Sequence, residues 1–129
     1  MRIDAPVSPG DIIDRITILQ IKQENIPDPA KRASVTQELA ALNAIRGRFP
    51  QLSEPQIVSI ERRLYKRNRT LWRLEDRLRA LERKRSFGCV FVVAARRVYM
   101  ANDRRAQLKR QINDLLGSEF REEKWFSEK

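Results

Sequence analysis

Two long seams of hydrophobic residues run through the second half of the chain, with members separated alternately by three and four positions. The first seam consists of Ile57, Ile60, Leu64, Arg67, Leu71, Leu74, Leu78 and Leu81, and the second of Phe91, Ala94, Val98, Ala101, Arg105, Leu108, Ile112 and Leu115. This spacing aligns each seam along one side of an α-helix. Each seam is interrupted once, by Arg67 in the first and by Arg105 in the second.

The segment between the seams, around Ser86 to Gly88, is expected to turn the chain back on itself. In the resulting antiparallel hairpin, facing residues have numbers that sum to about 172, so Arg67 is expected to face Arg105. Two cations in one layer of an apolar interface repel each other unless an anion neutralises them. The sequence therefore predicts an anionic group at this layer, and the polar residues that would assist in holding it are Asn68, Asn102 and Lys109.

Three interpretations of the arginine layer remain open. Both side chains could bend outwards and leave only their methylene groups on the seam. They could close an internal salt-bridge network, for which the candidate acids are Asp14, Glu75 and Asp103. They could instead bind a phosphate or carboxylate ligand, because guanidinium groups form bidentate hydrogen bonds with both. Asn68 and Glu75 are expected to be at least partly buried in any of these cases.

The first half of the chain predicts two shorter helices, over residues 9–26 and 29–46. Ser8 is placed to cap the first helix. Pro27 and Pro29 end it, and Asp28 is placed to cap the second. The first helix carries apolar residues around most of its circumference, so it is expected to be buried on two faces.

The remaining elements are a third helix over residues 54–84, capped by Ser53, and a fourth over residues 88–116, ended by Gly117. Residues 118–129 form a tail that mixes acids with aromatic side chains. The fold class predicted is all-α: an up-down four-helix bundle built on the long antiparallel hairpin, in a single domain over residues 1–129.

The composition narrows the possible chemistry. The chain of 129 residues contains no histidine and one cysteine, which leaves no zinc site, no internal disulfide and no Ser-His or Cys-His catalytic pair. We predict no cofactor, no metal and no catalytic residue, and we expect Cys89 to be a small core residue. Because no leader and no membrane-spanning apolar run is visible, a cytoplasmic location is expected.

The net charge of +10 is concentrated in the predicted hairpin. Residues 53–116 contain 17 lysines and arginines against 7 acids, whereas the two flanking parts of the chain are nearly neutral. The positive electrostatic potential of such a segment attracts nucleic acids, anionic lipid head groups and acidic proteins.

Three segments resemble a small bacterial family known only as a domain of unknown function, DUF family 6165: SPGDIIDRITILQIK (Ser8 to Lys22), LWRLEDR (Leu71 to Arg77) and VYMANDRRAQLKRQINDLLGSEFREEK (Val98 to Lys124). The resemblance implies a compact helical unit without an established activity, from a family sometimes encoded near glycosyltransferases of cell-surface polysaccharide synthesis. The polar positions that match are Asp14, Lys22, Trp72, Glu75, Asp76, Tyr99, Asn102, Asp103, Arg105, Lys109, Asn113, Glu122, Glu123 and Lys124. The chain departs from the family pattern at Arg15, where lysine is expected, and at Trp125.

The favoured function is that of an interaction or regulatory module with an internal anion site, linked through the resemblance to polysaccharide synthesis. The partners expected are a second copy in a homodimer, an acidic protein or a small anionic ligand. One alternative is a basic hairpin that binds nucleic acid without sequence preference. Another is an enzyme of the helical chorismate-mutase kind, in which interior cations hold a small dicarboxylate. That alternative is less favoured, since such mutases begin with one long helix and Pro27 interrupts this one.

Overall fold

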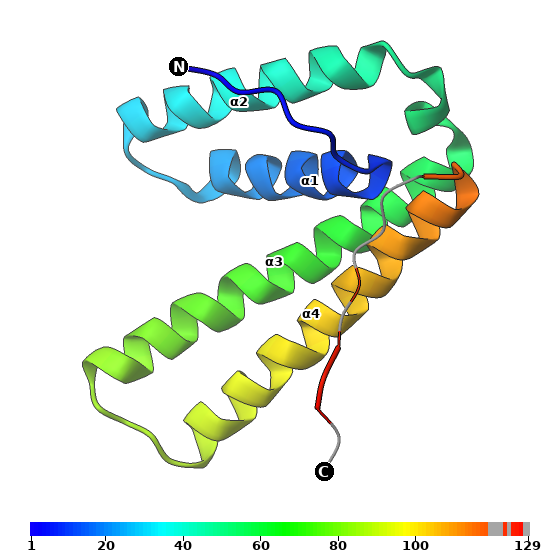
Figure 1. Cartoon of the computed structure of the whole chain (residues 1–129). Coiled ribbons are helices and arrows are strands. Elements are labelled where there is room, and N and C mark those ends of the chain that lie inside the picture. The colour runs from blue at the N-terminus through cyan, green and yellow to red at the C-terminus, as the bar shows by residue number, and fades with distance from the viewer. Residues whose placement is uncertain (119–122, 124, 128–129) are drawn as a thin grey trace.

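The computed structural model describes residues 1–118, 123 and 125–127, which contain helices and no strand (Figure 1). The helices are α1 (Pro9–Asn25), α2 (Pro29–Gly47), the 3₁₀ helix η1 (Pro50–Ser53), α3 (Pro55–Arg83) and α4 (Cys89–Leu115). The predicted all-helical class is therefore confirmed. Each long helix lies within one residue of its predicted bounds, whereas η1 was not predicted.

Three of the helix ends follow capping residues in the sequence. The Ser8 side chain accepts a hydrogen bond from the Asp11 amide at 3.2 Å, and Asp28 accepts one from the Ala30 amide at 3.0 Å. Gly117 adopts a φ of 60° just beyond α4. The predicted cap at Ser53 is wrong, because the 3₁₀ turn takes up Ser53 and α3 starts only at Pro55.

The four long helices are stacked rather than closed around one axis. Helices α3 and α4 form an antiparallel hairpin, α1 packs on both of them, and α2 packs on α1 and η1 (Figure 1). Helix α1 thus lies between α2 and the hairpin, which confirms that it is buried on two faces. The up-down four-helix bundle expected from the sequence is not confirmed, because α2 packs on α1 and η1 rather than along the hairpin.

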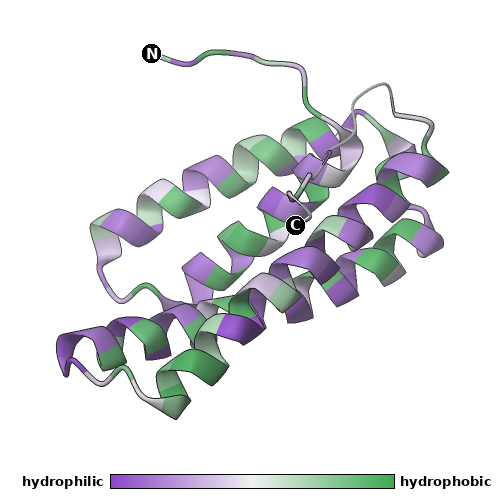
Figure 2. Ribbon diagram, turned by 60° about the horizontal axis from the view of Figure 1, so that its bottom comes forward, coloured by the Kyte–Doolittle hydropathy of each residue, from purple (hydrophilic) through white to green (hydrophobic). Residues whose placement is uncertain are grey.

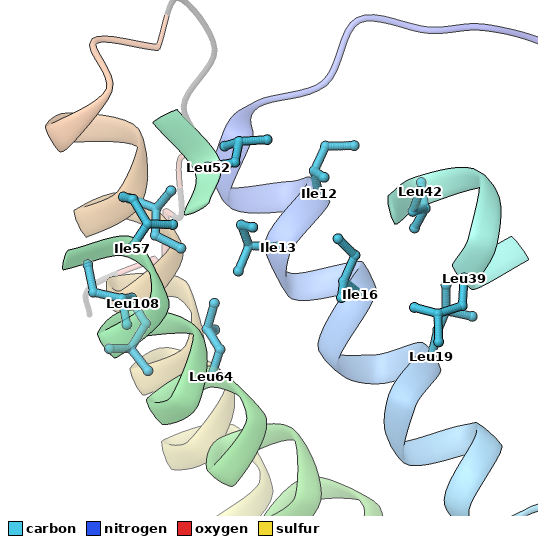
Figure 3. Close-up of a cluster of buried hydrophobic side chains, with 12 residues drawn as sticks. Ile12, Ile13, Ile16, Leu19, Leu39, Leu42, Leu52, Ile57, Leu64 and Leu108 are labelled. Atoms are coloured by element: carbon cyan, nitrogen blue, oxygen red, sulfur yellow. The ribbon is translucent and has the colours of Figure 1, made fainter. Parts of the chain in front are cut away.

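The hydrophobic core lies where α1 crosses the hairpin. Ile13, Leu64 and Leu108 are fully buried there, and side chains from α1, α2, η1 and both hairpin helices meet in one cluster (Figure 3). Arg46 lies at the edge of this core. It forms a bidentate ion pair with Glu61 at 2.9 and 2.7 Å and donates a hydrogen bond to the Leu52 carbonyl. The seam spacing gave no sign of this pair, which joins α2 to α3.

The far half of the α3–α4 hairpin projects beyond the region covered by α1 and α2 (Figure 1). Residues 82–90 are all exposed, and Arg85 turns the chain in the left-handed region with a φ of 52°. Cys89 is exposed here, so its expected place in the core is wrong. The apolar run that contains it begins at the uncovered end of α4 and has no neighbouring helix to cover its outer side. In the part of the chain that the structure describes, no helix is long and apolar enough to cross a membrane.

Candidate functional site

A buried polar cluster joins α1 to the hairpin. The carboxylate of Asp14, whose side chain is only 3% exposed, accepts hydrogen bonds from Arg105 Nε at 2.9 Å and from Arg105 Nη2 at 2.5 Å. Asn68 Nδ2 donates to the same carboxylate and to Thr17 Oγ1, both at 2.9 Å. Asp14, one of the candidate acids for an internal salt bridge, therefore pairs with Arg105 and Asn68, and Arg67 takes no part in this cluster.

Lys109, a buried cation, lies one turn further along α4 from the partly buried Arg105. Its Nζ is 2.9 Å from a carboxylate oxygen of Asp11. Partial burial raises the pKa of Asp11, but the hydrogen bond and charge of Lys109, together with hydrogen bonds from Ser8, outweigh that effect, so the pKa lies below its ordinary value. The pairing satisfies the charge of Lys109 inside the fold.

Gly10 allows the start of α1 to approach α4 closely. Its amide donates to Asn113 Oδ1 at 2.8 Å, and a Cβ added to this glycine would lie 2.6 Å from the Lys109 carbonyl oxygen. Only glycine fits such an approach without displacing backbone. Sequence reasoning missed this contact, although a glycine in the first turn of a helix, directly after a proline, was a signal that could have been noticed.

Arg67 and Arg105 leave the seam in different directions. Arg105 reaches Asp14 on the side where α1 packs, whereas Arg67 is exposed and lines a groove together with Arg104. Numbers that sum to about 172 place residues in one layer of the hairpin but do not fix the side to which a long side chain turns. Of the other predicted residues, Asn102 is half-buried, and Glu75 and Asp103 are exposed, so the expected burial of Glu75 is wrong.

The groove beside Arg67 is strongly basic. It has a volume of about 280 Å³ between α3 and α4, and its lining residues are Arg63, Lys66, Arg67, Thr70, Arg104 and Leu108. We call it the basic groove. Among the described residues that line it, four are cations and none is an acid. Within the described part of the chain, no ion pair joins any of these four cations to an acid.

A more apolar hollow continues the basic groove towards the hairpin turn. It measures about 410 Å³ and is lined by Leu74, Arg77, Cys89, Val90, Val93, Ala94 and Arg97. The α3 residues of the groove and the hollow follow one another at helical intervals of three and four, so both lie on one side of the hairpin. This side is not the one on which Asn68 and Arg105 contact α1.

The chemistry of this side differs from that of the α1 interface. At the α1 interface, Arg105 pairs with Asp14 and Lys109 pairs with Asp11, and these ion pairs join α4 to α1. The basic groove instead presents arginine side chains to solvent, where they can form bidentate hydrogen bonds with carboxylates or phosphates. Among the described residues, no cluster of histidine, cysteine or acidic side chains suited to a metal ion is found.

The family model for a family of unknown function, DUF6165, matches residues 1–128. The chain belongs to this family. The resemblance seen in the three sequence segments is thereby confirmed over nearly the whole chain. A search of curated proteins and a search of solved structures found no match to the chain.

Proposed function

We propose that this protein is a helical binding module that holds an acidic, amphipathic segment of a partner protein in the basic groove and the adjoining hollow. The observation that carries the proposal is the set of four cations in the groove, with no acid among the described residues of its lining. Like charges this close repel one another, and an anionic partner relieves the repulsion.

The hollow supports a protein segment over a nucleic acid. Its lining combines Leu74, Val90 and Val93 with the cations Arg77 and Arg97. An amphipathic helix would bury leucine-like side chains on the apolar residues and place its acids beside the arginines. A nucleic acid backbone would use the cations but gain nothing from the aliphatic residues.

The enzyme alternative receives less support from the interior contacts. A mutase-like site needs interior cations that are available to a dicarboxylate. Asp14 and Asp11 already contact Arg105 and Lys109, and replacing these acids by a ligand would break two ion pairs that join α1 to the hairpin. The anion site that we propose on the outer side of the hairpin therefore differs from the one expected from the sequence, and Arg67 is the only residue that the two share.

The proposal also includes the setting expected from the sequence: a bacterial, cytoplasmic protein that forms a homodimer and acts near cell-surface polysaccharide synthesis. The family resemblance supports the setting. The homodimer rests on the exposed Trp125 and Phe126, which are 84% and 69% exposed, because the chain itself covers α1.

A direct test measures binding of a dye-labelled helical peptide with leucines at every third or fourth position and glutamates between them. Fluorescence anisotropy should show binding that weakens with salt. The charge-reversal pair Arg63→Glu and Arg67→Glu should weaken it at least about tenfold, which corresponds to the loss of two charge-assisted contacts. The matched control pair, Lys31→Glu and Arg48→Glu, makes the same change in net charge on exposed positions away from the groove and should retain most of the binding.

A single-stranded DNA oligonucleotide of equal charge serves as the competing probe. Tighter binding of the DNA, with the same dependence on Arg63 and Arg67, would replace the proposal by the nucleic-acid alternative. Equal losses in the groove pair and in the control pair would mean that net charge alone attracts the peptide, which contradicts a specific groove.

A further inference from the structure

The end of the α3–α4 hairpin exposes several hydrophobic side chains to solvent. We define the hairpin end as residues 83–97. Phe87, Val90, Val92 and Val93 are 51%, 50%, 49% and 47% exposed there, although residues of these types are usually buried. In Figure 2 the ribbon just after the hairpin turn is largely coloured as hydrophobic. This apolar surface lies at the part of the molecule that projects furthest from α1 and α2 (Figure 1).

The charges of the hairpin end all have one sign. It contains five cations, namely Arg83, Lys84, Arg85, Arg96 and Arg97, and no aspartate or glutamate. Arg83 ends α3, and Lys84 and Arg85 follow it in the turn. Arg96 and Arg97 come after the valines on α4, so cations stand on both sides of the apolar residues along the chain. A second copy of this chain would bring two such basic ends together, which makes self-docking through this surface unfavourable.

The apolar residues are distributed around α4 rather than along one face. Val90 and Val93 line the hollow, whereas Val92 lies about 160° around the helix from Val90 and points to the other side. A groove in a partner protein would cover one face and leave the other in water. A lipid interface surrounds an inserted end on all sides.

The dimensions of the hairpin end match a shallow insertion. From Cys89 to Arg96, α4 rises about 10 Å, so Arg96 and Arg97 lie roughly one interfacial depth from the start of the helix. Lys84 and Arg85 lie at the turn itself, and their long side chains would extend to the head groups. We propose that the hairpin end inserts into the interfacial region of an anionic lipid surface, with its arginines and lysines among the head groups.

This inference does not rest on the proposed function. The two surfaces share Cys89, Val90, Val93, Ala94 and Arg97. Phe87 and Val92, however, are not among the residues that line the hollow or the groove, and Arg63 and Arg67 lie outside the hairpin end. Variants at these unshared residues therefore test the two proposals separately.

The experiment is co-sedimentation of the full chain with vesicles of phosphatidylcholine alone and with vesicles of equal parts phosphatidylcholine and phosphatidylglycerol. We expect partitioning into the anionic vesicles only. The pair Phe87→Ser and Val92→Ser should lower it at least about tenfold through the lost apolar insertion. A fluorophore on Cys89, the chain's single cysteine, should shift to shorter emission wavelengths on binding, because it leaves water.

Charge variants separate insertion from general attraction. The pair Lys84→Glu and Arg96→Glu should weaken partitioning much more than the matched pair Lys31→Glu and Arg48→Glu, which changes the net charge equally at a distance from the end. Equal effects of the two pairs, or an unchanged fluorophore spectrum, would overturn the proposal in favour of attraction by the overall charge. An absence of vesicle binding would also overturn it.

Two further measurements test whether copies of the chain contact each other through this surface and whether the variants still fold. Light scattering on the Phe87→Ser, Val92→Ser variant should give the same mass as the original chain, and a lower mass would identify the hairpin end as a contact between copies. Circular dichroism melting of each variant should match the original chain, since all four substituted positions of the hairpin end are exposed. A variant that melts early is replaced by Phe87→Ser alone, for which the same loss of partitioning is required.

Discussion

At the scale of single residues, two arginines that occupy equivalent positions in the sequence pattern have different roles. Arg105 is bound to a buried carboxylate and joins α1 to α4, whereas Arg67 is exposed in the basic groove. The difference arises from what lies on each side of the hairpin. Asp14 is on α1, and α1 packs on only one side, so only one of the two arginines can reach it.

Removing the side-chain charge of Arg105 should therefore destabilise the protein. We expect Arg105→Met to lower the free energy of unfolding by about 3 kcal/mol, because it leaves the buried carboxylate of Asp14 without its guanidinium. Chemical denaturation measures this change. The matched substitution Arg67→Met should change the free energy by no more than about 0.5 kcal/mol, as is usual for exposed positions.

The double variant Asp14→Leu, Arg105→Met tests the explanation. If the cost of Arg105→Met comes from the unpaired carboxylate, removing Asp14 as well should recover most of the lost stability. A double variant less stable than Arg105→Met would instead show that the two side chains contribute through packing rather than as an ion pair.

At the scale of elements, the α3–α4 hairpin consists of a covered half and an open half. Along one seam of α3, Leu64 is fully buried, whereas Leu78 is only partly buried. Both belong to the same three-and-four pattern, so the pattern alone does not distinguish them. Helix α1 is shorter than the hairpin and therefore covers only part of it.

The two halves should respond differently to the same substitution. Leu64→Ala should lower the free energy of unfolding by about 2 to 5 kcal/mol, because it opens a cavity in the core. Leu78→Ala should cost about half as much or less, since solvent already reaches that side chain. The pair is internally matched, because both substitutions make the same change in helix propensity on the same helix. Equal shifts in the denaturation midpoint would contradict the division into covered and open halves.

At the scale of the whole molecule, the net charge of +10 and the exposed aromatic side chains act in opposite directions on self-association. Charge repulsion keeps copies apart at low salt, and the exposed Trp125 and Phe126 favour contact. Because salt screens the repulsion more than the apolar attraction, association should increase with ionic strength.

Light scattering after size separation tests the homodimer. We expect a mass of about twice 15.2 kDa at moderate salt. The variant Trp125→Ser, Phe126→Ser should shift the equilibrium towards the single chain, and Phe49→Ser, another exposed aromatic outside the tail, should not. A mass of 15.2 kDa that persists as protein and salt concentrations rise would show that the chain does not self-associate.

The sequence by itself determined the helices. Hydrophobic periodicity, the caps at Ser8 and Asp28 and the glycine at 117 are local features, so they predict where helices begin and end without knowledge of their neighbours. The sequence also predicted the antiparallel pairing of α3 and α4, because a short turn places two apolar seams side by side and each seam is buried by facing the other. The prediction that Ser53 caps α3 was wrong for a local reason, because Ser53 belongs to the 3₁₀ helix η1.

Tertiary structure alone decided which polar residues meet. Asp14 and Arg105 are 91 positions apart, and the contact between them depends on the side of the hairpin that α1 occupies. The close approach at Gly10, the exposure of Cys89 and the side to which Arg67 turns have the same origin. A periodic pattern fixes the direction of a side chain relative to its own helix, but burial and pairing depend on which other helix reaches that position. The basic groove and the open hairpin end exist because no further helix of the described chain covers them.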